Sequence, residues 1–253
     1  MKRMGTVEKV LDILEVFLNQ QREISISELA NLSRLNISTV HHITSMLVNR
    51  GYLSQAHKRG KYSIGVKFLE FGSIARNSIK IANLAIPFLE ELNKVTDESV
   101  NLAILDSNEA VYIEHIESSH TLRTFTEVGN RVPLYCTGVG KVLLAHMTEE
   151  ELERFFNSNR LISYTDNTIT DLSQLKKQLT VIKHEGIAID KEEMESGVKC
   201  IASPVRDWNG NIVAAISISG PSTRLTSKRM EELRSLIKSS ASKISRAMGY
   251  KGE

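Results

Sequence analysis

Apolar residues recur at helical spacing from the start of the chain, at Val7, Val10, Leu11, Leu14 and Phe17/Leu18. This spacing predicts a first helix of about a dozen residues. A second, short helix is expected at Ser25-Ile26-Ser27-Glu28, because Ser followed three residues later by Glu forms a capping box. A third helix is expected from the N-cap residue Asn36 to Arg50, with Gly51 ending it.

The third predicted helix is amphipathic. Its apolar stripe consists of Val40, Ile43 and Leu47, which are expected to be buried. The opposite face holds small or hydrogen-bonding side chains with no acid among them, namely Ser38, His41, His42, Ser45 and Asn49. Such a face is suited to a DNA groove, although a solvated surface role for the two histidines fits as well.

Two short strands, 52–54 and 61–64, are expected around the turn 57–60, which forms a hairpin with a cationic tip. Helix, short helix, helix and basic hairpin is the order of a winged helix-turn-helix, in which the third helix contacts bases and the wing contacts phosphates. A packing or dimerisation module is the alternative interpretation of this segment. The residues predicted to bind DNA are Ser27, Ser38, Thr39, His41, His42, Ser45, Lys58, Arg59 and Lys61.

A linker helix is expected over 66–80, where Phe68, Leu69, Phe71 and Ile74 recur at helical spacing. The next helical stretch, 81–95, contains Pro87, which predicts a kink or a new helix near that position. The expected organisation is therefore a DNA-binding domain over 1–65, a linker helix over 66–78 and a larger domain over 79–253. The apolar linker face fits dimerisation and packing on its own domain equally well.

Alternating strand and helix patterns follow. Strands are expected at 100–105, 110–116, 122–128, 187–190, 198–205 and 212–219, and helices after Gly138, after the capping box at Thr148, at 172–184 and at 227–248. Turns at 106–109 and 207–210 make the first two and the last two strands hairpins. This pattern predicts an α+β fold, an antiparallel sheet with helices packed on it.

Strand alternation brings polar side chains to one face of this sheet. Ile212, Ala214, Ile216 and Ile218 point one way, so Ser217 and Ser219 point the other. By the same argument Asp190, Cys200, Ser217 and Ser219 converge on one pocket. Thr137-Gly138-Val139-Gly140 is expected to open a helix whose free amides and positive dipole end attract a carboxylate.

Composition and charge narrow the function classes. Residues 1–65 carry nine Lys/Arg against five Asp/Glu, and the remainder carries 23 against 25, so a basic unit precedes a mildly acidic one. No apolar run is long enough to cross a bilayer and the start of the chain does not resemble a signal peptide, so we expect a cytoplasmic protein. The two cysteines, Cys136 and Cys200, are expected to be free thiols.

No catalytic set emerges, and neither a cofactor nor a metal is expected. Gly140-Lys141 lacks the other residues of a phosphate-binding loop. No spacing places Cys200 beside His184 or His146 as a nucleophile and base, and His115 and His120 do not form a helical metal pair. An enzyme or an adaptor fused to a helix-turn-helix remains the alternative to a regulator.

Eight segments, in this order, resemble the IclR family of bacterial transcriptional regulators: 26–30, 38–41, 51–53, 62–65, 133–141, 167–170, 197–202 and 215–221. One departure concerns the third helix, where family members often carry Lys and Arg and this chain has Ile37 and His42, so base preference is not transferable. The resemblance implies a winged helix-turn-helix, a linker helix and a C-terminal GAF-like effector-binding domain.

The resemblance also implies which residues contact an effector: Thr121, Thr124, Thr137, Gly138, Val139, Asp190, Cys200, Ser217 and Ser219. Thr124 is expected on the strand at 122–128 and Thr121 directly before it. The effector implied is a small organic acid, and the loop Tyr135-Cys136-Thr137-Gly138 resembles members that respond to sugar-derived keto acids. A repressor is expected, acting as a homodimer or dimer of dimers whose wings contact half-sites of double-stranded operator DNA.

Overall fold

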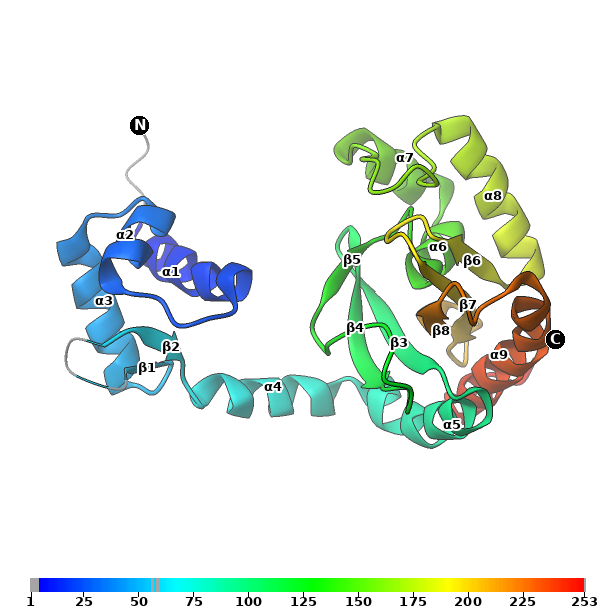
Figure 1. Ribbon diagram of the computed structural model, residues 1–253, viewed down its shortest axis with the longest axis horizontal. Helices are drawn as coiled ribbons and strands as arrows, with labels where there is room; N and C mark the ends of the chain where they lie inside the picture. Colours follow the sequence, from blue (N-terminus) through cyan, green and yellow to red (C-terminus); the bar gives the residue numbers. More distant parts are fainter. Residues whose placement is uncertain (1–4, 56, 58–59, 253) are drawn as a thin grey trace. The chain divides into compact units, whose positions relative to one another are not determined.

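The computed structural model describes residues 5–55, 57 and 60–252, and its backbone divides into two units, Met1–Ser78 and Ile79–Glu253. The N-terminal unit comprises α1 (Thr6–Gln20), α2 (Ile26–Ser33), α3 (Ile37–Asn49), β1 (Leu53–Gln55), β2 (Tyr62–Ile64) and α4 (Lys67–Ser78). Figure 1 shows α1, α2 and α3 gathered beside the β1–β2 hairpin. The predicted order of helices and hairpin is confirmed.

Side chains cap both helices of the helix-turn-helix. The Ser25 hydroxyl accepts a hydrogen bond from the Glu28 amide at 3.4 Å, and the Asn36 side chain accepts one from the Thr39 amide at 3.1 Å. The reciprocal half of the predicted capping box at α2 is absent, because the Glu28 carboxylate binds the Arg22 guanidinium instead. Each cap satisfies one of the amides that a helix start leaves unpaired.

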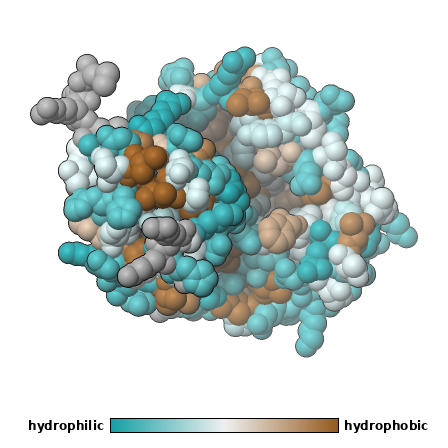
Figure 2. Space-filling view, turned by 60° about the vertical axis from the view of Figure 1, so that its left-hand side comes forward, coloured by the Kyte–Doolittle hydropathy of each residue, from teal (hydrophilic) through white to brown (hydrophobic). Residues whose placement is uncertain are grey.

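The buried face of α1 differs from the predicted one. Ile13, Val16 and Phe17 are buried, whereas Val7 and Leu18 are 71% and 72% exposed. Apolar residues surround more than one face of this helix, so periodicity alone did not select the side that packs. The N-terminal unit consequently shows hydrophobic as well as hydrophilic areas on its surface (Figure 2).

The hairpin is held close to the end of α3. The strands pair antiparallel, with Leu53 opposite Ile64, and Ile24 bridges to Tyr62. Gly65 lies against the backbone of Gly51, where a Cβ at residue 65 would come within 2.1 Å of the Gly51 carbonyl oxygen. Only glycine fits there, which fixes how the chain leaves the wing.

The helical connection breaks before Pro87, not at it. α5 (Lys80–Thr96) runs through Pro87, and the break between α4 and α5 falls at Ile79, whose φ of −86° and ψ of 82° are not helical. Of the two predicted alternatives at Pro87, a kink or a new helix, the new helix is therefore wrong. Ala85 and Leu89, on either side of the proline, are fully buried, so packing of this helix in its own unit offsets the missing backbone hydrogen bond.

The C-terminal unit is an α+β domain built on one antiparallel sheet. Its remaining elements are β3 (Ser99–Asp106), β4 (Glu109–Ile116), β5 (Arg131–Pro133), α6 (Gly138–Ala145), α7 (Glu149–Ser158), α8 (Leu172–Glu185), β6 (Ala188–Lys191), β7 (Val198–Arg206), β8 (Ile212–Pro221) and α9 (Ser227–Ala247). The strand order is β5-β4-β3-β8-β7-β6. Both predicted hairpins, β3–β4 and β7–β8, are present.

One predicted strand is wrong. Residues 122–128 form an irregular segment, and the edge strand is instead β5, which pairs with the start of β4. Leu122 and Phe125 are 66% and 80% exposed, so this alternating segment has no partner strand to bury its apolar positions. The segment crosses one face of the sheet and contributes to the pocket described below.

The sheet has an apolar layer on each side. α5 and α9 cover one face, and α6 and α8 lie over the other (Figure 1). Ala214, Ile216 and Ile218 pack in the first layer and Ala215 in the second, as the predicted alternation requires. The prediction is wrong for Ile212, which packs against the second layer because the pairing of β7 with β8 is irregular between Val205 and Arg206. Within the described ranges, no helix combines the length and the apolar character needed to cross a membrane.

Candidate functional site

The first candidate site is the outer face of α3. Ser38, His41 and His42 are exposed there, while Thr39 and Ser45 are half-buried. The Ser38 hydroxyl donates to the Asn36 side chain, and the Ser45 hydroxyl donates to the His41 carbonyl at 2.7 Å. The imidazoles are therefore the longest hydrogen-bonding groups that this face presents to a groove.

Residues around α3 extend this face. Ser27, in the first turn of α2, and Lys61, just before β2, are both exposed. Lys58 and Arg59, predicted at the wing tip, lie outside the described residues. Sequence reasoning missed Arg34, an exposed cation in the turn between α2 and α3, whose left-handed φ of 55° marks the end of α2. The sequence feature that could have identified Arg34 is a basic residue in the predicted turn between the two helices of the helix-turn-helix.

The second candidate site lies on the sheet face beneath α6. Pairing aligns Asp190 with Cys200 and Cys200 with Ser219 in one row across β6, β7 and β8. The neighbouring row continues from Ser217 to Asn101 and His115 on β3 and β4. Two rows of polar side chains thus meet in the middle of an otherwise apolar sheet.

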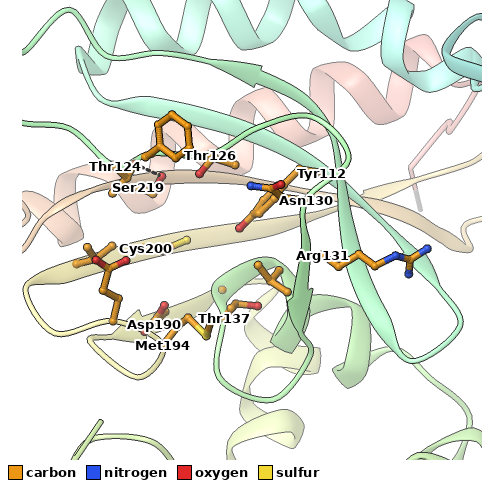
Figure 3. Close-up of a pocket in the computed structure, with 15 residues that line it drawn as sticks. Tyr112, Thr124, Thr126, Asn130, Arg131, Thr137, Asp190, Met194, Cys200 and Ser219 are labelled. Atoms are coloured by element: carbon orange, nitrogen blue, oxygen red, sulfur yellow. Dashed lines mark hydrogen bonds between the residues drawn. The ribbon is translucent and has the colours of Figure 1, made fainter. Parts of the chain in front are cut away.

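A cavity of about 290 Å³ opens over these rows. Its walls come from β4, the segment 124–132, the start of α6 and the loop after β6 (Figure 3). The lining residues include Tyr112, Thr124, Phe125, Thr126, Asn130, Arg131, Thr137, Gly138, Asp190, Met194, Cys200 and Ser219. The volume suits a small organic molecule.

Six of the nine predicted effector residues line this cavity: Thr124, Thr137, Gly138, Asp190, Cys200 and Ser219. Ser217 is fully buried behind them, and Val139 packs in the apolar layer under α6. Thr121 is exposed on the irregular segment and does not line the cavity. The structure therefore brings together the strand residues and the start of α6.

The start of α6 borders the cavity through Thr137 and Gly138. The Thr137 hydroxyl accepts a hydrogen bond from the Gly140 amide at 3.2 Å and donates to the Pro133 carbonyl at 2.8 Å. The amides of Gly138 and Val139 have no intrahelical partner at a helix start, and the Gly138 backbone forms a hydrogen bond to the Cys200 thiol. Gly138 must be small, because a Cβ there would come within 2.7 Å of the Cys200 sulfur. An anion at this end meets the positive pole of the helix.

Charge around the cavity is unusual for an acid-binding site. The Arg131 side chain points away from the other lining residues (Figure 3) and pairs with Asp106 and Glu109. Burial raises the pKa of Asp190 to about 7, although its carboxylate accepts a hydrogen bond from the Glu193 amide. An anionic ligand would therefore depend on backbone amides and hydroxyls, and two carboxyl groups, those of Asp190 and Glu195, line the same cavity.

Both cysteines are free and buried, and burial raises the pKa of each thiol to about 12. They are therefore protonated near neutral pH and unsuited to nucleophilic or metal-binding chemistry. No group of three or more His, Cys, Asp or Glu side chains capable of holding a metal ion occurs among the residues that the structure describes.

Sequence reasoning missed several polar residues of this site, among them the lining residues Thr126, Arg131 and Glu195. Tyr112 and Asn130 line the cavity, and Asn101 lies behind Ser217 and Ser219 with 1% of its surface exposed. Asn101 is a buried polar residue in the apolar strand 99–105, at the same parity as Ser99. The missing information was the register of β3 with β8. It places Ser99 and Asn101, which share one face of β3, opposite Ser219 and Ser217.

Comparison with known proteins gives the family. The model of the IclR helix-turn-helix domain matches residues 6–57, and that of the bacterial transcriptional regulator IclR C-terminal domain matches residues 74–246. The HTH-type transcriptional repressor AllR of Salmonella typhimurium is 34% identical over 250 residues, covering 99% of this chain and 92% of AllR.

Solved structures agree. The crystal structure of the Thermotoga maritima IclR is 33% identical, with a TM-score of 0.81 over 97% of this chain and 99% of the other. An IclR homolog from Microbacterium hydrocarbonoxydans, complexed with 4-hydroxybenzoate, shares the fold at 23% identity, with a TM-score of 0.86 over 96% and 99% of the two chains. The chain therefore belongs to the IclR family of bacterial transcriptional regulators, with a DNA-binding helix-turn-helix unit and a C-terminal α+β effector domain.

Proposed function

We propose that this regulator is a repressor whose binding to operator DNA is controlled by a small organic acid in the cavity beneath α6. The observation that carries the proposal is the convergence of the start of α6 with Asp190, Cys200 and Ser219 around one volume. The name of the repressor AllR and the 4-hydroxybenzoate complex of a protein with this fold support the two halves of the proposal.

The acid would bind with its carboxylate at the start of α6. Backbone amides, the helix dipole and hydroxyl groups supply its partners, since the Arg131 guanidinium is paired elsewhere. A ligand that binds two arrangements of the protein unequally shifts their populations and so changes affinity for DNA. Thr121, Val139 and Ser217, whose side chains do not line the cavity, remain proposed effector residues.

On the DNA side, we propose that His41 and His42 contact base edges, with Ser27, Ser38, Thr39 and Ser45 beside them, and that Lys61 and the wing tip at Lys58 and Arg59 contact phosphates. A homodimer, or a dimer of dimers, would place two such surfaces on half-sites one helical turn apart. The protein would act in the cytoplasm, where a bacterial regulator meets its operator.

Footprinting on DNA upstream of the regulator's own gene tests both halves, with and without a panel of keto and aromatic acids. We expect one or more acids to release the protein from DNA, and Asp190→Ala or Ser219→Ala to abolish release while retaining DNA binding. Ser203→Ala is the matched control, because Ser203 is a buried strand serine whose hydroxyl donates to the Gly186 carbonyl, away from the cavity. A normal response in both cavity variants would exclude this pocket.

His41→Ala and His42→Ala should weaken sequence-specific binding, whereas Asn19→Ala on α1 should not. Lys61→Ala should weaken binding to all sequences alike and reduce the slope of log affinity against log salt by about 1. Unchanged operator affinity in both histidine variants would contradict the assignment of α3 as the base-reading helix.

A further inference from the structure

Behind the cavity wall, polar side chains from three strands and one loop form a continuous hydrogen-bond chain. His115 Nδ1 lies 2.6 Å from Asn101 Oδ1, and Asn101 Nδ2 lies 3.1 Å from the Ser219 hydroxyl and 3.2 Å from that of Ser217. The Ser219 hydroxyl in turn lies 3.1 Å from that of Thr124, a bond drawn in Figure 3. The chain thus runs from β4 to the cavity.

His115 and Asn101 together determine which group donates and which accepts in each hydrogen bond of this series. An amide oxygen can only accept, so the His115 ring carries its proton on Nδ1 and donates to Asn101. Burial lowers the pKa of His115, which favours the neutral ring. Its Nε2 is buried without a partner among the described residues, and an unprotonated nitrogen fits that position. The amide nitrogen of Asn101 then donates one proton to the Ser217 hydroxyl and the other to the Ser219 hydroxyl.

Counting protons shows what reaches the cavity. Ser219 and Thr124 have two hydroxyl protons between them, and their mutual hydrogen bond uses one, whichever group donates it. Asn101 donates to Ser219 and accepts nothing from it. One hydroxyl proton of the pair is therefore left, and both residues line the cavity, so this proton is available to a bound molecule.

We infer that Asn101, oriented by His115, is a positioning residue that makes the Ser219–Thr124 pair a hydrogen-bond donor to the effector. The inference rests on the proposed function and deepens it by specifying the ligand's chemistry. A carboxylate offers acceptors to this pair and to the α6 amides at once. A primary amide of the same shape must turn an NH₂ group toward one set of donors, so the cavity selects the acid over its amide.

Asn101→Asp tests this direction. A carboxylate at residue 101 accepts from both serine hydroxyls, so the Ser219 proton is withdrawn and Thr124 must donate to Ser219, leaving the cavity without the donor. We expect acid affinity to fall about 10- to 100-fold, and the acid-to-amide affinity ratio to fall with it. A structural defect alone would weaken both compounds equally. Thr96→Val, which removes a buried hydroxyl outside the cavity, is the control for that case.

The measurement is calorimetric titration of the full chain with two acid and amide pairs, pyruvate with pyruvamide and 4-hydroxybenzoate with 4-hydroxybenzamide. If an acid binds the wild type and the acid-to-amide affinity ratio is the same in Asn101→Asp as in the wild type, this inference is overturned while the proposed acid site stands. Failure of both acids to bind the wild type overturns the proposed acid site and this inference together.

A second test does not depend on that variant folding. Long-range ¹H–¹⁵N correlation spectra should show His115 of the wild type protonated on Nδ1, and protonation on Nε2 would overturn the inference. His115→Leu removes the donor that orients Asn101, so we expect it to reduce the acid-to-amide ratio by about 3-fold, less than Asn101→Asp does. A ratio equal to that of the wild type would count against the role of His115.

Discussion

Helices α3 and α6 both begin at a capping side chain and both form part of a candidate binding surface, yet they present their residues in opposite ways. α3 buries Val40, Ile43, Thr44 and Leu47 and leaves its other face in solvent. Every residue of α6 is buried, so only its first turn faces the cavity. α3 therefore offers one side of the helix to a ligand, whereas α6 offers only its N-terminal end.

This difference determines whether local sequence periodicity or the tertiary structure brings the residues of each surface together. The residues of α3 lie within one helix, so helical periodicity assigns them to one face. Those of the α6 cavity come from β4, β6, β7, β8 and an irregular segment far apart in sequence. The N-terminal surface is thus local and exposed, and the C-terminal one is assembled and buried, which predicts different responses to substitution.

The largest difference concerns ion pairs. Lys141 on α6 is fully buried, and its ammonium group contacts Glu193 at 2.5 Å and the Ile189 carbonyl at 2.6 Å. Lys141→Met should lower the free energy of unfolding by about 3–5 kcal/mol, because it leaves the Glu193 carboxylate buried without its partner. Urea unfolding followed by Trp208 fluorescence and circular dichroism measures this. Adding Glu193→Leu should restore much of the loss, and failure to do so would refute the ion-pair explanation.

The buried carboxyl group of Asp190 should make the stability of the C-terminal unit depend on pH. Because burial raises the pKa of Asp190 to about 7, the folded chain holds a proton that the unfolded chain releases from about pH 4 upward. Asp190 thus makes unfolding easier as pH rises through this window, by on the order of 4 kcal/mol. Asp190→Asn should flatten the urea midpoint between pH 4 and 7 and exceed wild-type stability at pH 8. Exposed Asp166→Asn is the control, and parallel profiles for Asp190→Asn and the wild type would contradict the prediction.

Substitutions of the helix caps should affect the two candidate binding surfaces independently. Asn36→Ala removes the cap of α3 and Thr137→Ala that of α6, each at a cost of about 1 kcal/mol. We expect Asn36→Ala to weaken operator binding and spare acid binding, and Thr137→Ala to do the reverse. Gel retardation and calorimetry measure the pair. Equal effects of both variants on both ligands would show that the sites are not separable in this way.

The smallest effect is expected at the surface ion pair of the N-terminal unit. Arg22 contacts Glu28 with nearly half of its side chain exposed, and this hydrogen bond lowers the pKa of Glu28. Its contribution is present above the usual pKa of a glutamate and is lost as pH falls below it. Arg22→Met should leave the urea midpoint at pH 7 unchanged within error. A shift as large as that of Lys141→Met would remove the contrast between exposed and buried pairs.

Several elements were predictable because their signals are local. The caps at Ser25, Asn36 and Thr148 depend on a side chain three residues from the amide that it binds, so the sequence contains both partners. The same holds for the break at Gly186, whose φ of 66° ends α8. The segment 122–128 was misassigned for the converse reason, since a strand needs a neighbour and alternation does not supply one.

The sequence by itself determined the order of elements, the polar face of α3 and the parity that turns Ser217 and Ser219 to one side of a strand. Those properties follow from backbone periods of 3.6 and 2 residues, which each segment carries alone. Only the tertiary structure decided which strands adjoin, and so placed Asn101 behind the serines, Thr124 against Ser219 and the start of α6 over Cys200. Register and packing join residues more than 90 positions apart, and no local pattern encodes those distances.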